Sequence, residues 1–171
     1  RTPIHMVSAF VSGNQLVLGQ LKVDNKENEI VAIPRLLELL DLRKSTVTID
    51  AMGCQKQIAQ QIIEQKGNYV LAVKENQPTL HEQIVTTFNE ARLEKFKGWT
   101  HDYADSVESG HGRLETRKLW VTSDIAHLGV AGDWPGLTCI VMAESTRQMR
   151  DKTSTETRYF ITSHKKPDAM F

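Results

Sequence analysis

The chain has 171 residues, of which 40% are hydrophobic, which is enough for the core of one domain or of one domain with a large insertion. No apolar run approaches the length of a transmembrane helix. Lys and Arg together number 21, and Asp and Glu together also number 21, so the net charge does not indicate a nucleic-acid partner. Any such function has to be argued from local clusters of charge.

The first part of the chain predicts a β-hairpin, at which we expect the main sheet to begin, followed by a helix. Residues 4–11 and 15–23 are apolar and rich in β-forming residues, and the SGN between them is typical of a turn. Apolar residues from Ile30 to Leu42 then recur at helical spacing. Pro34 lies within this stripe, and we expect it to be tolerated only in the first turn of the helix.

The segment TVTIDAMGCQKQIAQQIIEQKGNYVLAV, residues 46–73, predicts a strand, a helix that ends near Gly67, and a second strand. Such units are parallel, and the ligands of open α/β sheets collect at the carboxyl ends of the strands. Asp50 lies at the end of the first strand. It is therefore a candidate site residue, with capping of the following helix as the alternative.

Polar residues also follow the second of these strands. The sequence VKENQ should bring Lys74, Asn76 and Gln77 to the same sheet edge as Asp50. A carboxylate with a nearby cation and amides suits a site for metal and phosphate. The alternative is an ordinary strand-to-helix loop, in which Asn76 or Gln77 caps the helix that Pro78 opens.

The pattern changes after Gly98. The stretches RLETRKLWVT, LTCIVMAE and TETRYFITS predict strands with little helical pattern between them, and we expect an antiparallel β segment attached to the α/β part. The predicted organisation is thus an α/β part over residues 1–98 and a β-rich segment over residues 99–171. No pair of histidines has the spacing of a metal site on a helix.

Basic residues gather in this second part. Between residues 145 and 171 there are six Lys or Arg residues and three Asp or Glu residues. If RLETRK is a strand, alternation places Arg113, Glu115 and Arg117 on one face. These side chains would bind phosphate or pair with one another, and the pattern leaves both interpretations open.

The cysteines and the ends of the chain suggest its context. Cys54 and Cys139 lie far apart and have the spacing of neither a zinc site nor a disulfide framework, so a reducing cytoplasm is the simpler compartment. The sequence has no signal peptide and begins at Arg1, which predicts that it lies inside a longer protein. Residues 163–171 are expected to form a loop leading into another element.

Several phrases, in this order and over nearly the whole chain, resemble the H-repeat-associated family of bacterial insertion-sequence transposases. They are IHMVSAFVSGNQLVLGQLKVDNKENEIVAIPRLLELLDL, VTIDAMGCQK, VLAVKENQPTLHE and HGRLETR. The resemblance implies an α/β, RNase H-like mixed sheet with flanking helices and an antiparallel β insertion. It also implies a catalytic set of two Asp and one Glu that holds Mg²⁺ or Mn²⁺ for phosphodiester cleavage and strand transfer.

By this resemblance Asp50 matches the second Asp of the family and would be both a catalytic residue and a metal ligand. The first Asp would precede Arg1 and the Glu would follow Phe171. Glu115 is not its substitute, because it lies in the insertion segment. The chain is then a transposase core that is incomplete and inactive by itself, or alternatively a catalytically inactive DNA-binding or interaction remnant of a degraded transposase.

The implied partner is double-stranded DNA, both the ends of the element and its target. A homodimer in a complex with DNA is one arrangement that we consider, and no membrane is implied. The residues predicted to contact DNA are Lys74, Asn76, His111, Arg113, Arg117, Arg147 and Arg158.

Overall fold

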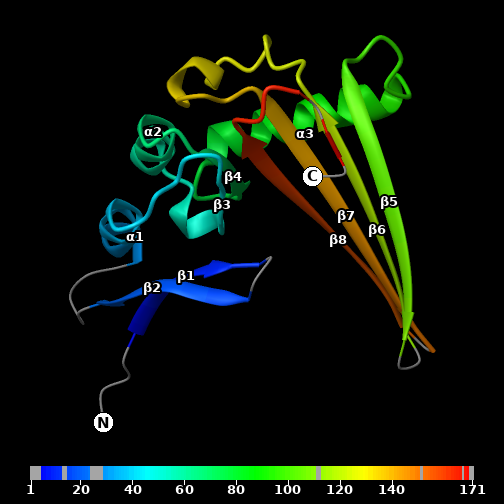
Figure 1. Cartoon of the computed structure of the whole chain (residues 1–171). Helices are drawn as coiled ribbons and strands as arrows, with labels where there is room; N and C mark the ends of the chain where they lie inside the picture. The colour runs from blue at the N-terminus through cyan, green and yellow to red at the C-terminus, as the bar shows by residue number, and fades with distance from the viewer. Residues whose placement is uncertain are drawn as a thin grey trace.

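The computed structural model describes residues 5–12, 15–23, 29–110, 113–150, 152–166 and 168–169. Within them the chain forms a two-stranded sheet, a six-stranded sheet and three α-helices (Figure 1). The elements are β1 (His5–Val11), β2 (Leu16–Val23), α1 (Glu29–Glu38), β3 (Thr46–Ile49), η1 (Ala51–Gly53), α2 (Lys56–Glu64), β4 (Asn68–Val73), α3 (Pro78–Leu93), β5 (His101–Gly110), β6 (Arg113–Thr122), η2 (Ala131–Asp133), β7 (Cys139–Met149) and β8 (Lys152–Thr162).

The large sheet is mixed. Its strand order is β3-β4-β8-β7-β6-β5, in which β3 and β4 are parallel and the other neighbours are antiparallel. The predicted strand, helix, strand unit over residues 46–73 is therefore confirmed as β3, α2 and β4. Because β4 pairs with β8, strands from both sides of residue 98 belong to one sheet. The division into two domains at that point stays a prediction.

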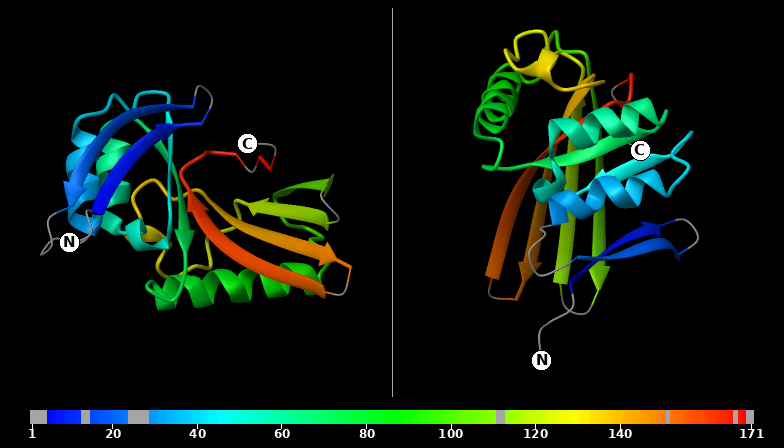
Figure 2. Two further views of the ribbon diagram at one scale, coloured as in Figure 1. Left: turned by 90° about the horizontal axis from the view of Figure 1, so that it is seen from below. Right: turned by 90° about the vertical axis from the view of Figure 1, so that its left-hand side faces the viewer.

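The main core lies on one face of this sheet. Helices α2 and α3 cover that face, and α3 runs along it in all three ribbon views (Figure 1, Figure 2). Ile62 of α2 and Phe88 of α3 are fully buried there with Leu71 and Ile161 of the sheet. A smaller cluster around Val141 covers part of the opposite face. None of the helices in the described ranges is both long enough and apolar enough to cross a membrane.

The predicted hairpin at the start of the chain is confirmed as β1 and β2. Its turn includes residues 13 and 14, which lie outside the described residues. The two strands pair with each other and with no other described strand, so they form a separate sheet that packs against α1. We expected the main sheet to begin at this hairpin, and the structure corrects that expectation.

Two further expectations need correction. Pro34 is the sixth residue of α1, beyond its first turn. The stripe still forms a helix because Ala32, Leu36 and Leu37 are buried, and this packing outweighs the single backbone hydrogen bond that proline removes. Strand β5 was not predicted, since most of its side chains are exposed and polar, and its pairing with β6 creates it.

Candidate functional site

Asp50 follows β3 directly and lies at the carboxyl edge of the sheet. Its Oδ1 atom accepts a hydrogen bond from the backbone N–H of Met52 at 3.2 Å, and the residue is exposed. The carboxylate thus caps the short 3₁₀ turn η1, whereas α2 is capped by Gln55 without a side-chain bond. The cap uses Oδ1, and Oδ2 has no partner among the residues the structure describes. Capping by Asp50 therefore leaves an oxygen that can bind a cation.

The loop after β4 fixes the turn that holds Asp50. Asn76 donates from Nδ2 to the carbonyl of Ala51 at 2.6 Å, and Gln77 donates from Nε2 to the carbonyl of Cys54 at 2.9 Å. These bonds join the loops that follow the two parallel strands, as expected for residues at one sheet edge. Gln77 occupies the N-cap position of α3 but makes no side-chain capping bond, so the capping alternative is wrong for it.

Gly53 is required where η1 returns toward β3. A Cβ atom built on Gly53 would overlap the Cγ2 methyl of Ile49 and would meet Cδ1 of Ile33 at 3.0 Å. Only a residue without a side chain allows the turn to approach the strand this closely. The AMG sequence after Asp50 is therefore part of what positions the carboxylate.

The alternation along β3 places Asp50 on the side of the sheet opposite helices α2 and α3. Ile49 of β3 pairs with Leu71 of β4, which pairs with Ile161 of β8, and these three residues face the core. Continuing the alternation by one residue places Asp50 with Ala72 and Phe160, on the opposite side. We call this side the open face.

Beyond the end of β4, the four strands β5 to β8 continue as an arm, which we define as residues 105–110, 113–118, 144–149 and 152–158. Strand β4 pairs with β8 only as far as Tyr159, so the arm extends past the edge where Asp50 lies (Figure 1). Arg113, Arg117, Arg147 and Arg158 alternate with residues that face α3, and all four lie on the open face of the arm.

Glu115 lies at the centre of the basic residues of the arm. Its carboxylate accepts hydrogen bonds from Arg117 Nη2 and from Arg147 Nε, each at 2.9 Å. It also forms ion pairs with Arg147 Nη2 at 2.7 Å and with Arg113 Nε at 3.4 Å. The Glu115 side chain is 12% exposed. Hydrogen bonding from Arg147, and then the charges of the neighbouring arginines, hold the pKa of this carboxyl below its usual range. The prediction that Arg113, Glu115 and Arg117 share a face is confirmed, and the arginines pair with the glutamate.

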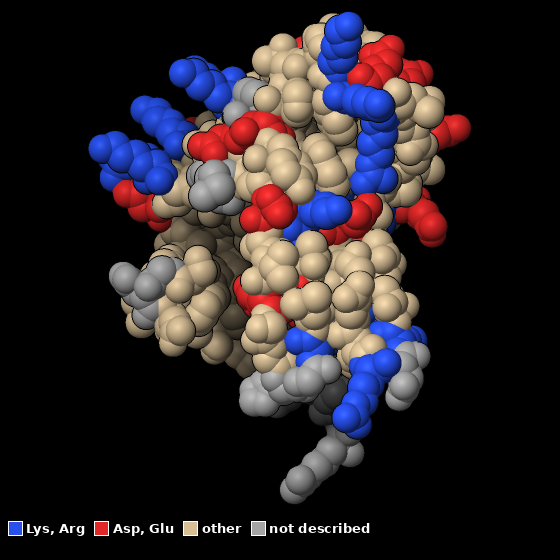
Figure 3. Space-filling view, turned by 90° about the vertical axis from the view of Figure 1, so that its right-hand side faces the viewer, with Lys and Arg blue, Asp and Glu red and all other residues tan. Residues whose placement is uncertain are grey.

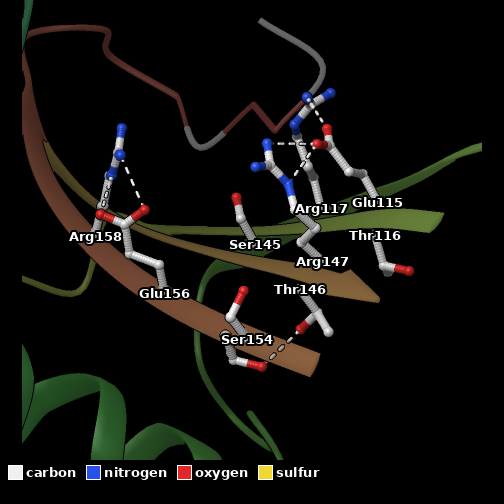
Figure 4. A pocket seen from close by; sticks show the side chains of 10 residues that line it. Glu115, Thr116, Arg117, Ser145, Thr146, Arg147, Ser154, Glu156 and Arg158 are labelled. Carbon is white, nitrogen blue, oxygen red and sulfur yellow. Dashed lines mark hydrogen bonds and ion pairs between the residues drawn. The ribbon is translucent and has the colours of Figure 1, made fainter. Parts of the chain in front are cut away.

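A second ion pair lies beside this cluster. Arg158 donates from Nε and Nη2 to Glu156 at 2.8 and 2.9 Å, and this pairing lowers the pKa of Glu156. Lys74 follows Val73, which pairs with Tyr159 of β8 where the arm begins, and the charge of Lys74 lowers the pKa of Glu156 further. Glu115, Arg117, Arg147, Glu156 and Arg158 line one shallow depression, together with the hydroxyls of Ser145 and Ser154 (Figure 4).

The structure thus brings most of the predicted DNA-contacting residues to one side of the molecule. Asn76 is engaged with Ala51, and His111 lies outside the described residues.

Sequence reasoning missed Glu156 and Glu108 as partners of the arginines. The spacing of Glu156 and Arg158 on a strand could have indicated the first, but Glu108 becomes a partner of Arg117 only through the pairing of β5 with β6.

Both acidic and basic side chains lie on the face of the molecule shown in Figure 3. On the face shown in Figure 3, Lys and Arg are interspersed with Asp and Glu, and they do not merge into one continuous basic patch. Arginine charge on the arm is likewise partly balanced by Glu108, Glu115 and Glu156. Binding of a polyanion there would depend on the arrangement of individual arginines more than on net charge.

Comparisons with known proteins identify the family of the chain. Residues 1–165 match the family described as "Transposase DDE domain". The chain is 46% identical to "Uncharacterized protein in dhlA 3'region" of Xanthobacter autotrophicus, over 94% of the chain and 53% of that protein. It is 46% identical to "Putative transposase YncI" of Escherichia coli O157:H7, over 94% of the chain and 41% of that protein. It is 38% identical to "H repeat-associated putative transposase YhhI" of Escherichia coli K12, over 95% of the chain and 44% of that protein.

The chain therefore spans about half the length, or less, of these curated relatives. No solved structure matches it. The family match covers nearly all of the chain, including Asp50, the parallel β3 and β4 strands and the arm. The mixed α/β fold is that of the RNase H-like class, and the chain belongs to the family of DDE-domain transposases.

Proposed function

We propose that this chain is part of the catalytic core of a DNA transposase that cuts and joins DNA at the ends of an insertion sequence. In this proposal residues 1–98 belong to the metal-binding core, and residues 99–171 form an insertion that contacts DNA. Asp50 supplies one carboxylate of the metal site. The observation that carries the proposal is the exposed Asp50 carboxylate at the carboxyl edge of β3, on the same side of the sheet as the arginines of the arm.

The unpaired edges of the two sheets support the proposal that this chain is only part of the catalytic core. Among the described strands, β1 pairs only with β2 and β3 pairs only with β4, so each keeps an edge without a strand partner. An isolated two-stranded sheet is only marginally stable. Met6, Phe10 and Leu18 of the hairpin are each at least half exposed. A further strand between β1 and β3, from outside residues 1–171, would join the sheets and bring a second carboxylate beside Asp50.

The residues that are present fit one part of a divalent-cation site. Asp50 offers an oxygen ligand of the kind that Mg²⁺ prefers. No group of three His, Cys, Asp or Glu side chains that could hold a metal occurs in the described ranges. A bound cation would supply Lewis-acid chemistry at the phosphate. The role of the chain itself is to hold Asp50 in place through Met52, Asn76 and the close packing of Gly53.

This chain should bind Mg²⁺ only weakly. One carboxylate cannot replace a set of three around an ion that loses its water reluctantly. Isothermal titration calorimetry of the 171-residue chain with MgCl₂ should show no saturable site at low concentration, and Asp50→Ala should remove the weak heat that remains. A tight site that persists in Asp50→Ala would place the metal centre elsewhere.

The arm should bind duplex DNA with an affinity that falls steeply with salt. Each phosphate contact contributes roughly 0.9 to the slope of log K against log salt. Arg113→Ala and Arg158→Ala should each lower that slope by about this amount, as measured by fluorescence anisotropy with a labelled duplex.

Arg43→Ala is the matched control for Arg158→Ala. Arg43 pairs with Asp41, two residues away, as Arg158 pairs with Glu156, but it precedes β3 and lies at the opposite edge of the sheet from Asp50. Its replacement should leave the affinity and the salt slope unchanged. If all three variants bind like the parent chain, the arm is not the DNA-contacting surface.

A further inference from the structure

The arginine cluster of the arm contains a carboxylate that a purely attractive surface for DNA would lack. Glu115 is directly paired across the sheet with Arg147 on β7 and with Glu108 on β5. Arg117, one step along β6 on the same face, donates to both carboxylates, at 3.0 Å to Glu108 and 2.9 Å to Glu115. Three arginines and two glutamates leave a net charge of only one, and removing Glu115 would increase it.

The contacts of Glu115 order the arginines. An exposed arginine is mobile at the surface, and a planar guanidinium held by two hydrogen bonds loses that freedom. Arg117 is held in this way by Glu108 and Glu115. Arg147 donates Nε–H to Oε1 of Glu115 at 2.9 Å, and its Nη2 forms an ion pair with the same oxygen at 2.7 Å, so two contacts to one atom hold its guanidinium. With a side chain that is 12% exposed, Glu115 lies below arginines whose side chains are 49% to 53% exposed.

The arginines still present donors to the solvent. Arg147 uses Nε and Nη2 for Glu115, and its Nη1 group has no partner among the described residues. Arg113 approaches Glu115 with Nε alone, at 3.4 Å. In Figure 4 the guanidinium groups of Arg117 and Arg147 converge on Glu115, with Ser145 beside them. Donors in a fixed planar arrangement are what two-point recognition of a phosphate requires.

We propose that Glu115 is a positioning residue that holds Arg113, Arg117 and Arg147 in register to receive phosphates of the DNA backbone. The proposal rests on the proposed function, since it assumes that the arm faces DNA. Glu115 does not touch the DNA in this arrangement. It orders the arginines that contact the DNA, and its negative charge lowers the net positive charge of the arm.

The test asks whether Glu115→Gln raises or lowers the affinity of the chain for DNA. The probe is a short fluorescein-labelled duplex of arbitrary sequence, and binding is measured by anisotropy in a salt series. If charge alone matters, removal of a negative charge tightens binding. If Glu115 positions the arginines, binding weakens severalfold, and the salt slope falls by about 0.9 for each phosphate that the arm no longer binds.

Glu108→Gln is the matched control. It removes the same charge from the directly paired position, but Glu108 is 66% exposed and pairs with Arg117 alone among the described residues. We expect this variant to bind as tightly as the parent chain or more tightly. Binding by Glu115→Gln that equals or exceeds that of the parent would overturn the positioning role.

A second variant decides the matter if Glu115→Gln disturbs the fold of the arm, as judged by circular dichroism. Arg147→Lys keeps the charge at an exposed position but removes the Nε–H donor and the planar guanidinium that contacts Glu115. If Glu115 positions the arginines, Arg147→Lys should bind DNA more weakly than the parent chain and with a smaller salt slope. Unchanged binding would contradict the positioning role. Absence of DNA binding by the parent chain would instead contradict the proposed function.

Discussion

Asp50→Asn should abolish DNA cleavage and joining by the longer protein that contains this chain, while the chain alone should be inactive. Asparagine keeps the shape of the side chain and an oxygen for the N–H of Met52, so the turn should remain capped. The substitution removes the charge that would hold the cation, and the rate of metal-assisted attack should therefore fall by orders of magnitude. The measurement is cleavage of DNA that carries the ends of the element, with Mg²⁺ or Mn²⁺ present.

Two other variants test whether the loss of activity is specific to the carboxylate of Asp50. Asp133→Asn removes an exposed carboxylate that pairs with Lys56, and exposed pairs of this kind contribute about 0 to 1 kcal/mol, so activity should persist. Glu115→Gln should act through DNA affinity, and its activity should return at saturating DNA. If Glu115→Gln remains as inactive as Asp50→Asn at saturating DNA while staying folded, Glu115 belongs to the catalytic set and our assignment of the third carboxylate to a later segment is wrong.

Gly53→Ala should destabilise the chain and displace the turn that carries Asp50. The new Cβ atom would overlap Ile49, whose side chain packs against the core and cannot move away freely. Inserting a methyl group into a well-packed site typically costs about 1–3 kcal/mol. For a domain of this size each kcal/mol lowers the melting temperature by roughly 2–4 °C. Thermal unfolding followed by circular dichroism measures the change.

Gly132→Ala is the matched control for this prediction. Gly132 also lies in a 3₁₀ turn, η2, and a Cβ atom there meets nothing within 4 Å. Its melting temperature should stay close to that of the parent chain. In the longer protein, Gly53→Ala should also reduce cleavage at temperatures where the protein is folded. Equal melting temperatures for the two variants would show that the turn tolerates a side chain.

Local patterns account for the elements around Asp50. The apolar spacing of α2 and the two short apolar strands specify a β–α–β unit, because burial of one helical face and of both strands needs no information from distant segments. Parallel strands end at one edge of a sheet, so the sequence also indicated that Asp50 and the loop of Asn76 meet. Hydrogen bonding of Asn76 to Ala51 confirms that they do.

By itself the sequence thus determined the helices, most of the strands, the edge on which Asp50 lies and the shared face of Arg113, Glu115 and Arg117. Only the tertiary structure decided that β5 is a strand, that the hairpin forms a separate sheet and that Arg147, 32 residues further along, joins Glu115. The physical reason is that periodicity reports which face of an element is buried, whereas the partners of a side chain across a sheet depend on strand order and register. Those are set by the packing of the whole molecule.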